Sequence, residues 1–323
     1  MKAHWLTRHW AQRDLASRSL LPLAAVYCAL MRLRSRRPTA RFSVPVVVVG
    51  NITVGGTGKT PLVAWLAEWL ARAGYRPGIV LRGYGGRSRS WPQCVAADTD
   101  PLAVGDEAVL LARRGWPVVA GPDRVLAVQT LLHRFSCDIV LSDDGLQHYR
   151  LARDLEICVI GRNRFGNGYC LPAGPLREPL SRLERVDARV TQGRAQPGEW
   201  RMRMRADGFF CVADPSARRM AADFANAKLC AVAGIGDPGG FFGTLKELGL
   251  DVESRSFADH HRFRARDFGF LGPQDAVVMT EKDAVKCVPF ADRRFWFLRV
   301  RADVDPAFGS WLLDVLKERE RRG

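Results

Sequence analysis

One stretch near the start of the chain, residues 46–61, most constrains what this protein can fold into. It begins with four consecutive valines, and such an unbroken apolar run is typical of a strand buried on both faces of a parallel sheet. A glycine-rich turn follows, and residues 62–70 then have the composition of a helix that closes at Gly74. The order of strand, glycine-rich turn and helix predicts a phosphate-binding loop.

The residues of this turn predict a nucleotide site. Glycines let backbone N–H groups converge on phosphate oxygens, and the dipole of the following helix favours anions. We expect Lys59 to reach the terminal phosphates and the Thr60 hydroxyl to bind Mg²⁺. The strict motif has glycine at the position of Thr53, and a turn that binds nothing is the alternative, although it would not need the Lys-Thr pair. The expected nucleotide-binding residues are Thr53, Val54, Gly55, Gly56, Thr57, Gly58, Lys59 and Thr60.

The charge balance indicates an anionic partner. The 323 residues, long enough for two domains or one large one, include 49 Lys and Arg against 34 Asp and Glu, a formal net charge of +15. Such a charge favours nucleic acid, an anionic membrane or a phosphorylated substrate. The sequence has no aromatic-rich ribonucleoprotein motif, zinc finger or basic-region heptads, so we expect no nucleic acid. The eight cysteines are scattered without a C-x-x-C pair, which is typical of reduced thiols in a reducing compartment.

Residues 1–41 differ from the rest of the chain and form the first predicted region. An apolar run at 20–31 is too short to cross a bilayer, which takes about 20 residues, and no signal-peptide cleavage site follows it. An apolar face beside clustered arginines predicts a helix that lies in a membrane interface. The alternative is an amphipathic helix packed on the domain, and both can hold at different turns. The flanking arginines are Arg13, Arg18, Arg32, Arg34, Arg36, Arg37 and Arg41.

Regular alternation of strands and helices follows, and it predicts a P-loop domain over residues 42–200. After the first strand, further strands are expected at 77–81, 117–120, 137–142 and 155–160, and helices at 106–114 and 123–133. This α/β pattern predicts a doubly wound, mostly parallel sheet with ligands at the carboxyl ends of its strands.

The pattern changes near residue 201. Apolar and basic residues alternate over 201–205, and the turn signal at 206–208 precedes residues 209–212, which predicts an antiparallel ribbon over a 201–226 linker. Residues 227–323 then predict a second, smaller α/β domain. Its expected strands are 228–233, 250–255, 276–280 and 295–300, with a helix at 241–248. We expect the active site between the two domains.

Three charged clusters are candidates for chemistry. Asp143 and Asp144 follow an apolar strand, where a carboxylate binds Mg²⁺ directly or through water, although aspartate is also a common turn former. Asp106 and Glu107 begin a predicted helix, either as base and metal ligand or merely as favourable first-turn acids. The 259–261 segment, Asp-His-His, offers a base across a cleft or a solvated loop.

Two further segments are less specific. Residues 174–179 form a rigid turn with an Arg-Glu pair. The segment 280–283, Thr-Glu-Lys-Asp, invites comparison with the guanine-reading box, but its lysine directly precedes the aspartate, so it does not predict GTP.

Taken in order, these segments resemble the tetraacyldisaccharide 4′-kinases of lipid A biosynthesis, over most of the chain. That family tolerates a residue other than glycine at position 53, and it usually has proline where this chain has Ala108 and Ala258. The matching segments are residues 49–61, 82–85, 105–107, 121–124, 143–148, 172–178, 257–261 and 280–283.

The resemblance implies an ATP- and Mg²⁺-dependent kinase that phosphorylates the 4′-hydroxyl of tetraacyldisaccharide 1-phosphate at the cytoplasmic face of the inner membrane. It implies two α/β/α domains joined by a β ribbon. It also implies that Asp106 is the general base, assisted by His260, and that Lys59 holds phosphate. The implied residues around the metal are Thr60, Asp143, Asp144 and Glu107, and those at the lipid headgroup are Tyr84, Arg124, His148 and Arg177.

Two other classes remain open from the residues alone. One is a P-loop ATPase that positions proteins or metals at membranes, although such proteins often carry lysine where this chain has Val54. The other is a nucleotide-binding membrane adaptor without acceptor chemistry.

Overall fold

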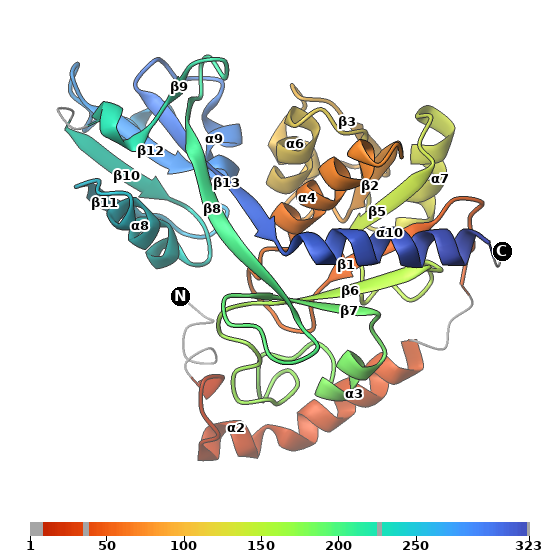
Figure 1. Ribbon diagram of the computed structural model, residues 1–323. Helices are drawn as coiled ribbons and strands as arrows, with labels where there is room; N and C mark the ends of the chain where they lie inside the picture. Colours follow the sequence, from red (N-terminus) through yellow and green to blue (C-terminus); the bar gives the residue numbers. More distant parts are fainter. Residues whose placement is uncertain (1–8, 35–38, 225–227, 322–323) are drawn as a thin grey trace. The chain divides into compact units, whose positions relative to one another are not determined.

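The structure, a computed structural model, describes residues 9–34, 39–224 and 228–321. The chain divides into two compact units. Unit 1 comprises Met1–Arg82, Trp116–Arg203 and Ala302–Gly323, and unit 2 comprises Gly83–Gly115 and Met204–Arg301. Two long strands, β8 (Trp200–Cys211) and β13 (Phe295–Val304), have residues in both units (Figure 1).

This division differs from the predicted domain ranges in two places. Residues 83–115 group with unit 2 because α6 (Asp106–Arg113) packs against α9 (Glu281–Cys287). Residues 302–323 group with unit 1 because α10 (Pro306–Glu320) packs against α4 (Lys59–Arg72). Neither long-range packing can be recognised from local sequence pattern.

Unit 1 is built on a parallel sheet in the strand order β7-β6-β1-β5-β2-β4, with the first residues of β8 parallel to β7. Val47 pairs with both Leu141 and Leu155, which places β1 between β5 and β6. The strands are β1 (Val46–Gly50), β2 (Pro77–Leu81), β4 (Val118–Ala120), β5 (Ile139–Asp143), β6 (Leu155–Ile160) and β7 (Ala188–Gln192).

Helices cover both faces of the unit 1 sheet. The chain moves from β1 to β2 through α4 in one direction and from β4 to β5 through α7 (Arg124–Arg134) in the other, so right-handed crossovers place these helices on opposite faces. Val46 and Val48 pack in the cluster that contains Leu131 of α7. Every residue of β1 is buried, which explains its unbroken apolar run and confirms the predicted doubly wound sheet.

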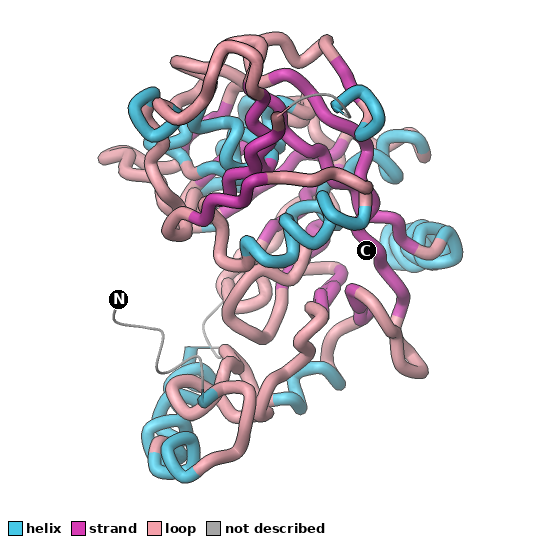
Figure 2. Tube along the Cα trace, turned by 90° about the vertical axis from the view of Figure 1, so that its left-hand side faces the viewer, coloured by secondary structure: helices cyan, strands magenta, loops and turns pink. Residues whose placement is uncertain are grey.

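The N-terminal helices α2 (Leu15–Ser19) and α3 (Leu21–Arg34) belong to unit 1 and form the lowest helical segment in Figure 2. Ala24 is buried in the same cluster as Val46, and Leu20, Tyr27 and Cys28 pack against that cluster. Within the described residues, no helix has the length and apolar character needed to span a bilayer. Arg36 and Arg37 of the predicted basic cluster lie outside the described residues.

The parallel strands of unit 2 run in the order β11-β10-β12-β13. Ala231 of β10 packs with Phe241 of α8 (Pro238–Glu247) on one face, and Val232 packs with Ala284 of α9 on the other. The predicted second α/β/α layer arrangement is therefore confirmed. The strands are β10 (Leu229–Ala233), β11 (Glu253–Ser256) and β12 (Ala276–Thr280).

Short elements complete both units. Unit 1 includes a 3₁₀ helix, η1 (Leu180–Glu184). In unit 2 they are β3 (Gln93–Val95), α5 (Pro101–Val104), β9 (Arg218–Arg219), η2 (Ala221–Phe224) and η3 (Ala265–Phe268).

The hairpin turn predicted at residues 206–208 is wrong. Strand β8 runs through this segment without reversing; it neighbours β13 in the sheet, and β9 pairs with it antiparallel, with Phe209 paired to Arg219. Asp207 is paired to Arg301 Nε at 2.8 Å, and Gly208 accommodates a φ of 119° within the strand. The Asp-Gly pair therefore marks an irregular point in one long strand and not a chain reversal.

Candidate active site

Residues 51–58 link β1 to the N-terminus of α4, in the strand, loop and helix order that the sequence predicts. Gly58 is the N-cap of α4 with a φ of 88°, and Gly55 has a φ of 103°. Both values lie in the left-handed region that favours glycine. Among the described residues, no heavy atom lies within 4 Å of a Cβ built on Gly55 or Gly56. The loop thus presents its backbone to open space at a helix N-terminus, as phosphate binding requires.

Thr53, at the position of the motif's first glycine, is held by hydrogen bonds. Its hydroxyl accepts from Asn51 Nδ2 at 3.2 Å, and its backbone pairs with Leu176 in an isolated antiparallel bridge. The neighbouring Val54 N donates to Pro175 O at 2.9 Å. Because this part of the loop is extended and paired, it does not require the conformational freedom of glycine.

Lys59 begins α4 beside polar groups of unit 1. Its Nζ donates to Asn51 Oδ1 at 3.3 Å and lies 3.5 Å from Asp144 Oδ1. Arg177 Nη1 donates to both carboxylate oxygens of Asp144, at 3.0 and 3.1 Å. Burial raises the pKa of Asp144, but the charges of Lys59 and Arg177 outweigh it and hold that pKa below its ordinary value. The ionised carboxylate therefore positions both cations at the mouth of the loop.

Thr60 and Asp143 form the part of the site that suits Mg²⁺. Thr60 Oγ1 donates to Asp143 Oδ2 at 2.8 Å, and Asp143 is only 3% exposed. A hydroxyl and a carboxylate beside a phosphate loop fit an ion that takes one or two protein ligands together with substrate phosphates. Within the described residues, no group of three or more His, Cys, Asp or Glu is placed to hold a metal ion.

The expected headgroup contact of Arg124 does not agree with its placement. The side chain is 1% exposed and donates to Gly121 O at 2.6 Å and to Asp143 O at 3.1 Å. Burial lowers its pKa to about 10, against the opposing charges of Asp143 and Asp144. Arg124 therefore supports the backbone of the candidate metal ligand from inside unit 1.

His148 is half-buried in unit 1 and neutral at neutral pH. Burial, followed by the positive charges of Arg124 and Arg82, lowers its pKa to about 4. A neutral imidazole offers one donor and one acceptor to a ligand.

The residues that link the 144–149 segment, which contains His148, to the phosphate loop were not predicted from the sequence. Gln147 Nε2 donates to Asn51 O at 3.0 Å and to Glu178 Oε1 at 2.7 Å, and Tyr149 donates to Glu178 Oε2 at 2.8 Å. The Arg177-Glu178 dipeptide does not pair internally: each side chain binds a different part of the 144–149 segment. The turn at 174–179 was visible in the sequence, but the sequence does not indicate that its side chains bind the 144–149 segment.

A cavity of about 460 Å³ lies between α3 and the segment around Glu178. Four arginines and two glutamates line it, so the charged lining has an excess of positive charge. These residues are Arg32, Arg153, Arg182, Arg185, Glu156 and Glu178.

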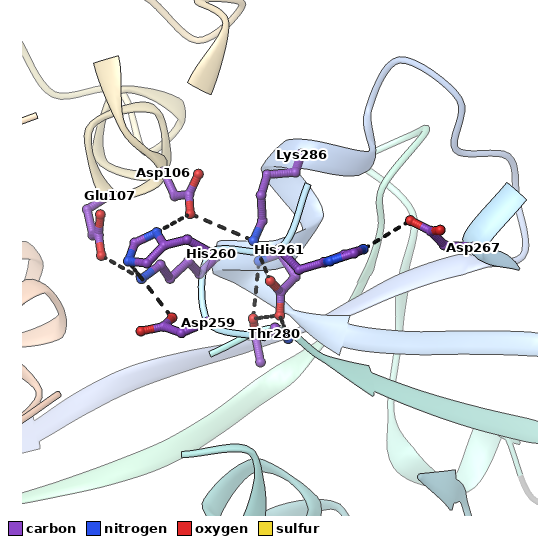
Figure 3. Close-up of polar contacts among 11 residues, drawn as sticks. Asp106, Glu107, Asp259, His260, His261, Asp267, Thr280 and Lys286 are labelled. Carbon is purple, nitrogen blue, oxygen red and sulfur yellow. Dashed lines mark hydrogen bonds and ion pairs between the residues drawn. The ribbon is translucent and has the colours of Figure 1, made fainter. Parts of the chain in front are cut away.

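A second group of candidate residues lies within unit 2, where Asp106 and Glu107 begin α6. The preceding Gly105 has a φ of 93°, and a Cβ built on it would lie 2.4 Å from Tyr84 O. Both the conformation and the close contact require glycine here. The turn leaves Asp106 only 6% exposed, with its carboxylate directed at the loop that carries His260 (Figure 3).

The structure brings Asp106 and His260 together. His260 Nδ1 lies 3.2 Å from Asp106 Oδ2, and His260 Nε2 lies 3.3 Å from Lys282 Nζ. Because an ammonium can only donate, the neutral imidazole accepts a hydrogen bond at Nε2 and donates one from Nδ1–H to Asp106. The hydrogen bond to Asp106 raises the pKa of His260 above its ordinary value, while burial and the charge of Lys282 oppose that rise.

The other two predicted residues of unit 2 lie beside this pair. The Tyr84 ring is 5.1 Å from the His260 ring between centroids, and the tyrosine is 63% exposed. Glu107 Oε1 lies 2.9 Å from Lys282 Nζ, so its carboxylate is paired with a lysine that sequence reasoning did not select. Glu107 belongs to unit 2, whereas Thr60 and Asp143 belong to unit 1.

The exposed face of α3 is apolar. Leu23, Val26, Leu30 and Leu33 are between 56% and 64% exposed and recur at the spacing of one helix face. The other face packs in unit 1 through Ala24. One face of α3 is therefore packed on unit 1, and the other is an exposed apolar stripe.

The family model and the similar proteins all point to one family. The family described as tetraacyldisaccharide-1-P 4′-kinase matches residues 16–317. A tetraacyldisaccharide 4′-kinase of Alkalilimnicola ehrlichii is 52% identical, over 95% of this chain and 94% of the relative, and one of Nitrosococcus oceani is 46% identical, over 98% and 96%.

A solved structure supports the fold. The crystal structure of the "apo" form of LpxK from Aquifex aeolicus in complex with ATP superposes with a TM-score of 0.77 at 27% identity, covering 94% of this chain and all of that one.

Proposed function

Because the chain belongs to the tetraacyldisaccharide 4′-kinase family, we propose that it transfers the γ-phosphoryl group of ATP to the 4′-hydroxyl of tetraacyldisaccharide 1-phosphate in lipid A biosynthesis. The observation that carries this proposal is the phosphate loop of unit 1, with Lys59 and the Thr60–Asp143 pair at its mouth. The relative solved with ATP supports the choice of nucleotide.

The phosphate loop binds the nucleotide. Residues 53–60 are the proposed nucleotide-binding residues: the backbone N–H groups of the glycine-rich turn at the N-terminus of α4 face the phosphates, and Lys59 supplies a positive charge for the transferred group. Asp144 and Asn51 hold the Lys59 ammonium in place before ATP binds. Preorganised charge of this kind stabilises the charge that spreads over the phosphoryl oxygens in transfer.

Thr60 and Asp143 would hold Mg²⁺, with Asp144 and Glu107 as further candidates. Mg²⁺ held by these residues would supply positive charge that offsets the negative charge of the phosphates. The chain's own contribution is to fix a hydroxyl and a carboxylate 2.8 Å apart at the end of β5, with Arg124 securing the backbone of Asp143.

Asp106 is the proposed general base for the 4′-hydroxyl, and His260 assists it. The carboxylate is buried, and its Oδ2 accepts a hydrogen bond from Nδ1–H of His260. This hydrogen bond orients the carboxylate and leaves Oδ1 to accept the hydroxyl proton. The same interaction raises the pKa of His260, so the imidazole stabilises negative charge on its partner.

Tyr84, His148 and Arg177 are the proposed contacts of the sugar headgroup. Tyr84 is exposed beside His260, and the neutral imidazole of His148 offers both a donor and an acceptor to hydroxyl groups. The cavity at α3 has an excess of arginine, which suits a substrate that already carries a phosphate.

We place the enzyme at the cytoplasmic face of the inner membrane as a peripheral protein. The support for this is the exposed apolar stripe of α3 and the arginines that follow it, Arg32 and Arg34, which suit an anionic lipid surface. The acyl chains of the proposed substrate are anchored in such a surface.

One assay tests the function. Purified protein is incubated with [γ-³²P]ATP, Mg²⁺ and tetraacyldisaccharide 1-phosphate, and the label is followed into lipid and into inorganic phosphate. We expect label in the lipid, at the 4′-position. Label released only as phosphate would indicate an ATPase, and no release at all would indicate a nucleotide-binding adaptor.

A further inference from the structure

Two lysines of α9 stand one helical turn apart and contact the two adjacent carboxylates that begin α6. Lys282 Nζ lies 2.9 Å from Glu107 Oε1, and Lys286 Nζ lies 3.7 Å from Asp106 Oδ2 (Figure 3). Residues at i and i+4 share a helix face, so one face of α9 engages both carboxylates.

A third ion pair secures the other end of α6. Arg114, the C-cap of α6, places Nη2 2.6 Å from Oε2 of Glu281, the first residue of α9. The three pairs together join both ends of α6 to α9. We call these three ion pairs the α6–α9 clamp: Lys282–Glu107, Lys286–Asp106 and Arg114–Glu281.

Lys286 is itself fixed in the core of unit 2. Its side chain is 5% exposed, and Nζ lies 2.7 Å from Oδ1 of the fully buried Asp283. Asp283 in turn accepts hydrogen bonds from Thr280 Oγ1 at 2.8 Å and from Gly234 N at 2.9 Å. The ammonium also lies 5.2 Å from the centroid of the Phe263 ring. Because its surroundings are packed and hydrogen-bonded, Lys286 presents a positive charge to Asp106 at a fixed place.

Lys282 contacts the histidine of the Asp106–His260 pair. Besides Glu107, its Nζ contacts His260 Nε2 at 3.3 Å, the ring nitrogen that faces away from Asp106. A donor at Nε2 fixes the tautomer in which Nδ1 carries the proton. In the Asp106–His260 pair, Lys282 therefore contacts the histidine and Lys286 contacts the aspartate.

We propose that Lys282 and Lys286 are positioning residues for phosphoryl transfer, which fix the geometry of the Asp106–His260 pair through the α6–α9 clamp. The inference rests on the proposed function, because it takes Asp106 as the base. It gives a role to the 280–283 segment: Thr280 and Asp283 anchor Lys286, Glu281 anchors the end of α6, and Lys282 orients His260. It also explains why α6, encoded between two strands of the unit 1 sheet, belongs to unit 2.

The test compares Lys282→Met and Lys286→Met in the full chain with Lys246→Met, an exposed lysine of α8 in the same unit. Because a misplaced catalytic group of this kind costs on the order of 10²-fold, we expect kcat to fall about 10- to 100-fold in each variant, with the KM for ATP changed less than about twofold. Arginine at either position keeps the charge and should restore most of the rate, and Lys246→Met should match the parent.

A double-mutant comparison separates positioning from general damage. In an Asp106→Asn background the group through which both lysines act is gone, so each Lys→Met change should cost less than about twofold in kcat.

Lys286→Met leaves the buried Asp283 carboxylate without its cation and can unfold the protein. Lys286→Met combined with Asp283→Asn removes both charges, and near-ultraviolet circular dichroism checks that this variant is folded.

The outcomes are distinct. Equal losses in the parent and Asp106→Asn backgrounds, or parental kcat in folded lysine variants, would overturn the inference while leaving an active parent as a kinase. A parent that transfers no label to the lipid overturns the proposed function, and the inference with it.

Discussion

Thr60 Oγ1 donates a hydrogen bond to Asp143 Oδ2 across 2.8 Å, which joins the first turn of α4 to the last residue of β5. Strand β5 is fully buried and α4 packs against it through a buried face, so regular secondary structure holds both oxygens. This pair is the proposed site of a nucleotide-bound Mg²⁺.

Replacing Thr60 tests this assignment. Thr60→Val keeps the shape of the side chain but removes the hydroxyl, so we expect kcat/KM to fall about 10- to 100-fold and the Mg²⁺ concentration needed for half-maximal rate to rise. Thr60→Ser retains the hydroxyl and serves as the control. A valine variant with the parental Mg²⁺ dependence would show that Thr60 is not a ligand.

Replacing the buried Arg124 should destabilise the fold. Arg124→Met removes the hydrogen bonds to Gly121 O and Asp143 O inside unit 1 and leaves those carbonyls without their donor, so we expect a loss of about 2–4 kcal/mol in the free energy of unfolding, measured in urea. Arg150→Met, at a surface ion pair, should cost less than about 1 kcal/mol. If Arg124→Met were as stable as the parent and only the KM for lipid rose, the side chain would be a substrate contact after all.

His148 makes stability depend on pH. Its pKa is about 4 in the folded chain, below the ordinary value of 6.5, because the imidazole is buried and faces Arg124 and Arg82. As pH falls below 6.5 the unfolded chain takes up a proton that the folded chain does not, so the contribution is complete above pH 6.5 and is lost progressively towards pH 4.

We expect His148 to account for about 1–3 kcal/mol of the stability lost between pH 7 and pH 4, after allowance for its partial exposure. Urea unfolding of the parent and of His148→Gln across this range measures the difference. The stability of the variant should fall less steeply, and two parallel curves would contradict the assignment.

The apolar stripe of α3 predicts membrane binding. Leu30→Ser combined with Leu33→Ser should weaken binding to phosphatidylglycerol vesicles at least about tenfold, because each buried leucine contributes on the order of 1.5–3 kcal/mol. Raised salt should weaken it further through the arginines. Leu126→Ser with Met220→Ser, two exposed apolar residues elsewhere, is the matched control. Equal sedimentation of both double variants would place the membrane contact elsewhere.

Much of unit 1 follows from local sequence. The valines of β1, the glycine-rich loop and Asp143 at the end of β5 each follow from short-range chemistry, because parallel strands are uniformly apolar and their polar residues gather at one edge. Strand β1 lies between β5 and β6, so the loop that follows β1 lies beside the end of β5 that carries Asp143.

Unit 2 shows why other features could not be predicted. The pairing of Asp106 with Lys286 joins residues far apart in the sequence, and nothing local indicates that α6 packs on α9. The Asp207-Gly208 pair has the composition of a turn, but its tertiary pairing with Arg301 keeps β8 extended. Local turn signals are overridden when long-range contacts stabilise the extended chain.

The most direct test of the account is the rate of phosphoryl transfer in Asp106→Asn, measured in a single turnover with labelled ATP and tetraacyldisaccharide 1-phosphate. Asparagine keeps the shape of the side chain but cannot accept the hydroxyl proton, so we predict a fall of about 10²–10⁴-fold with near-parental ATP affinity. His260→Ala should lose activity in the same way, and the double variant should be little slower than Asp106→Asn alone. Transfer by Asp106→Asn at the parental rate would contradict the account.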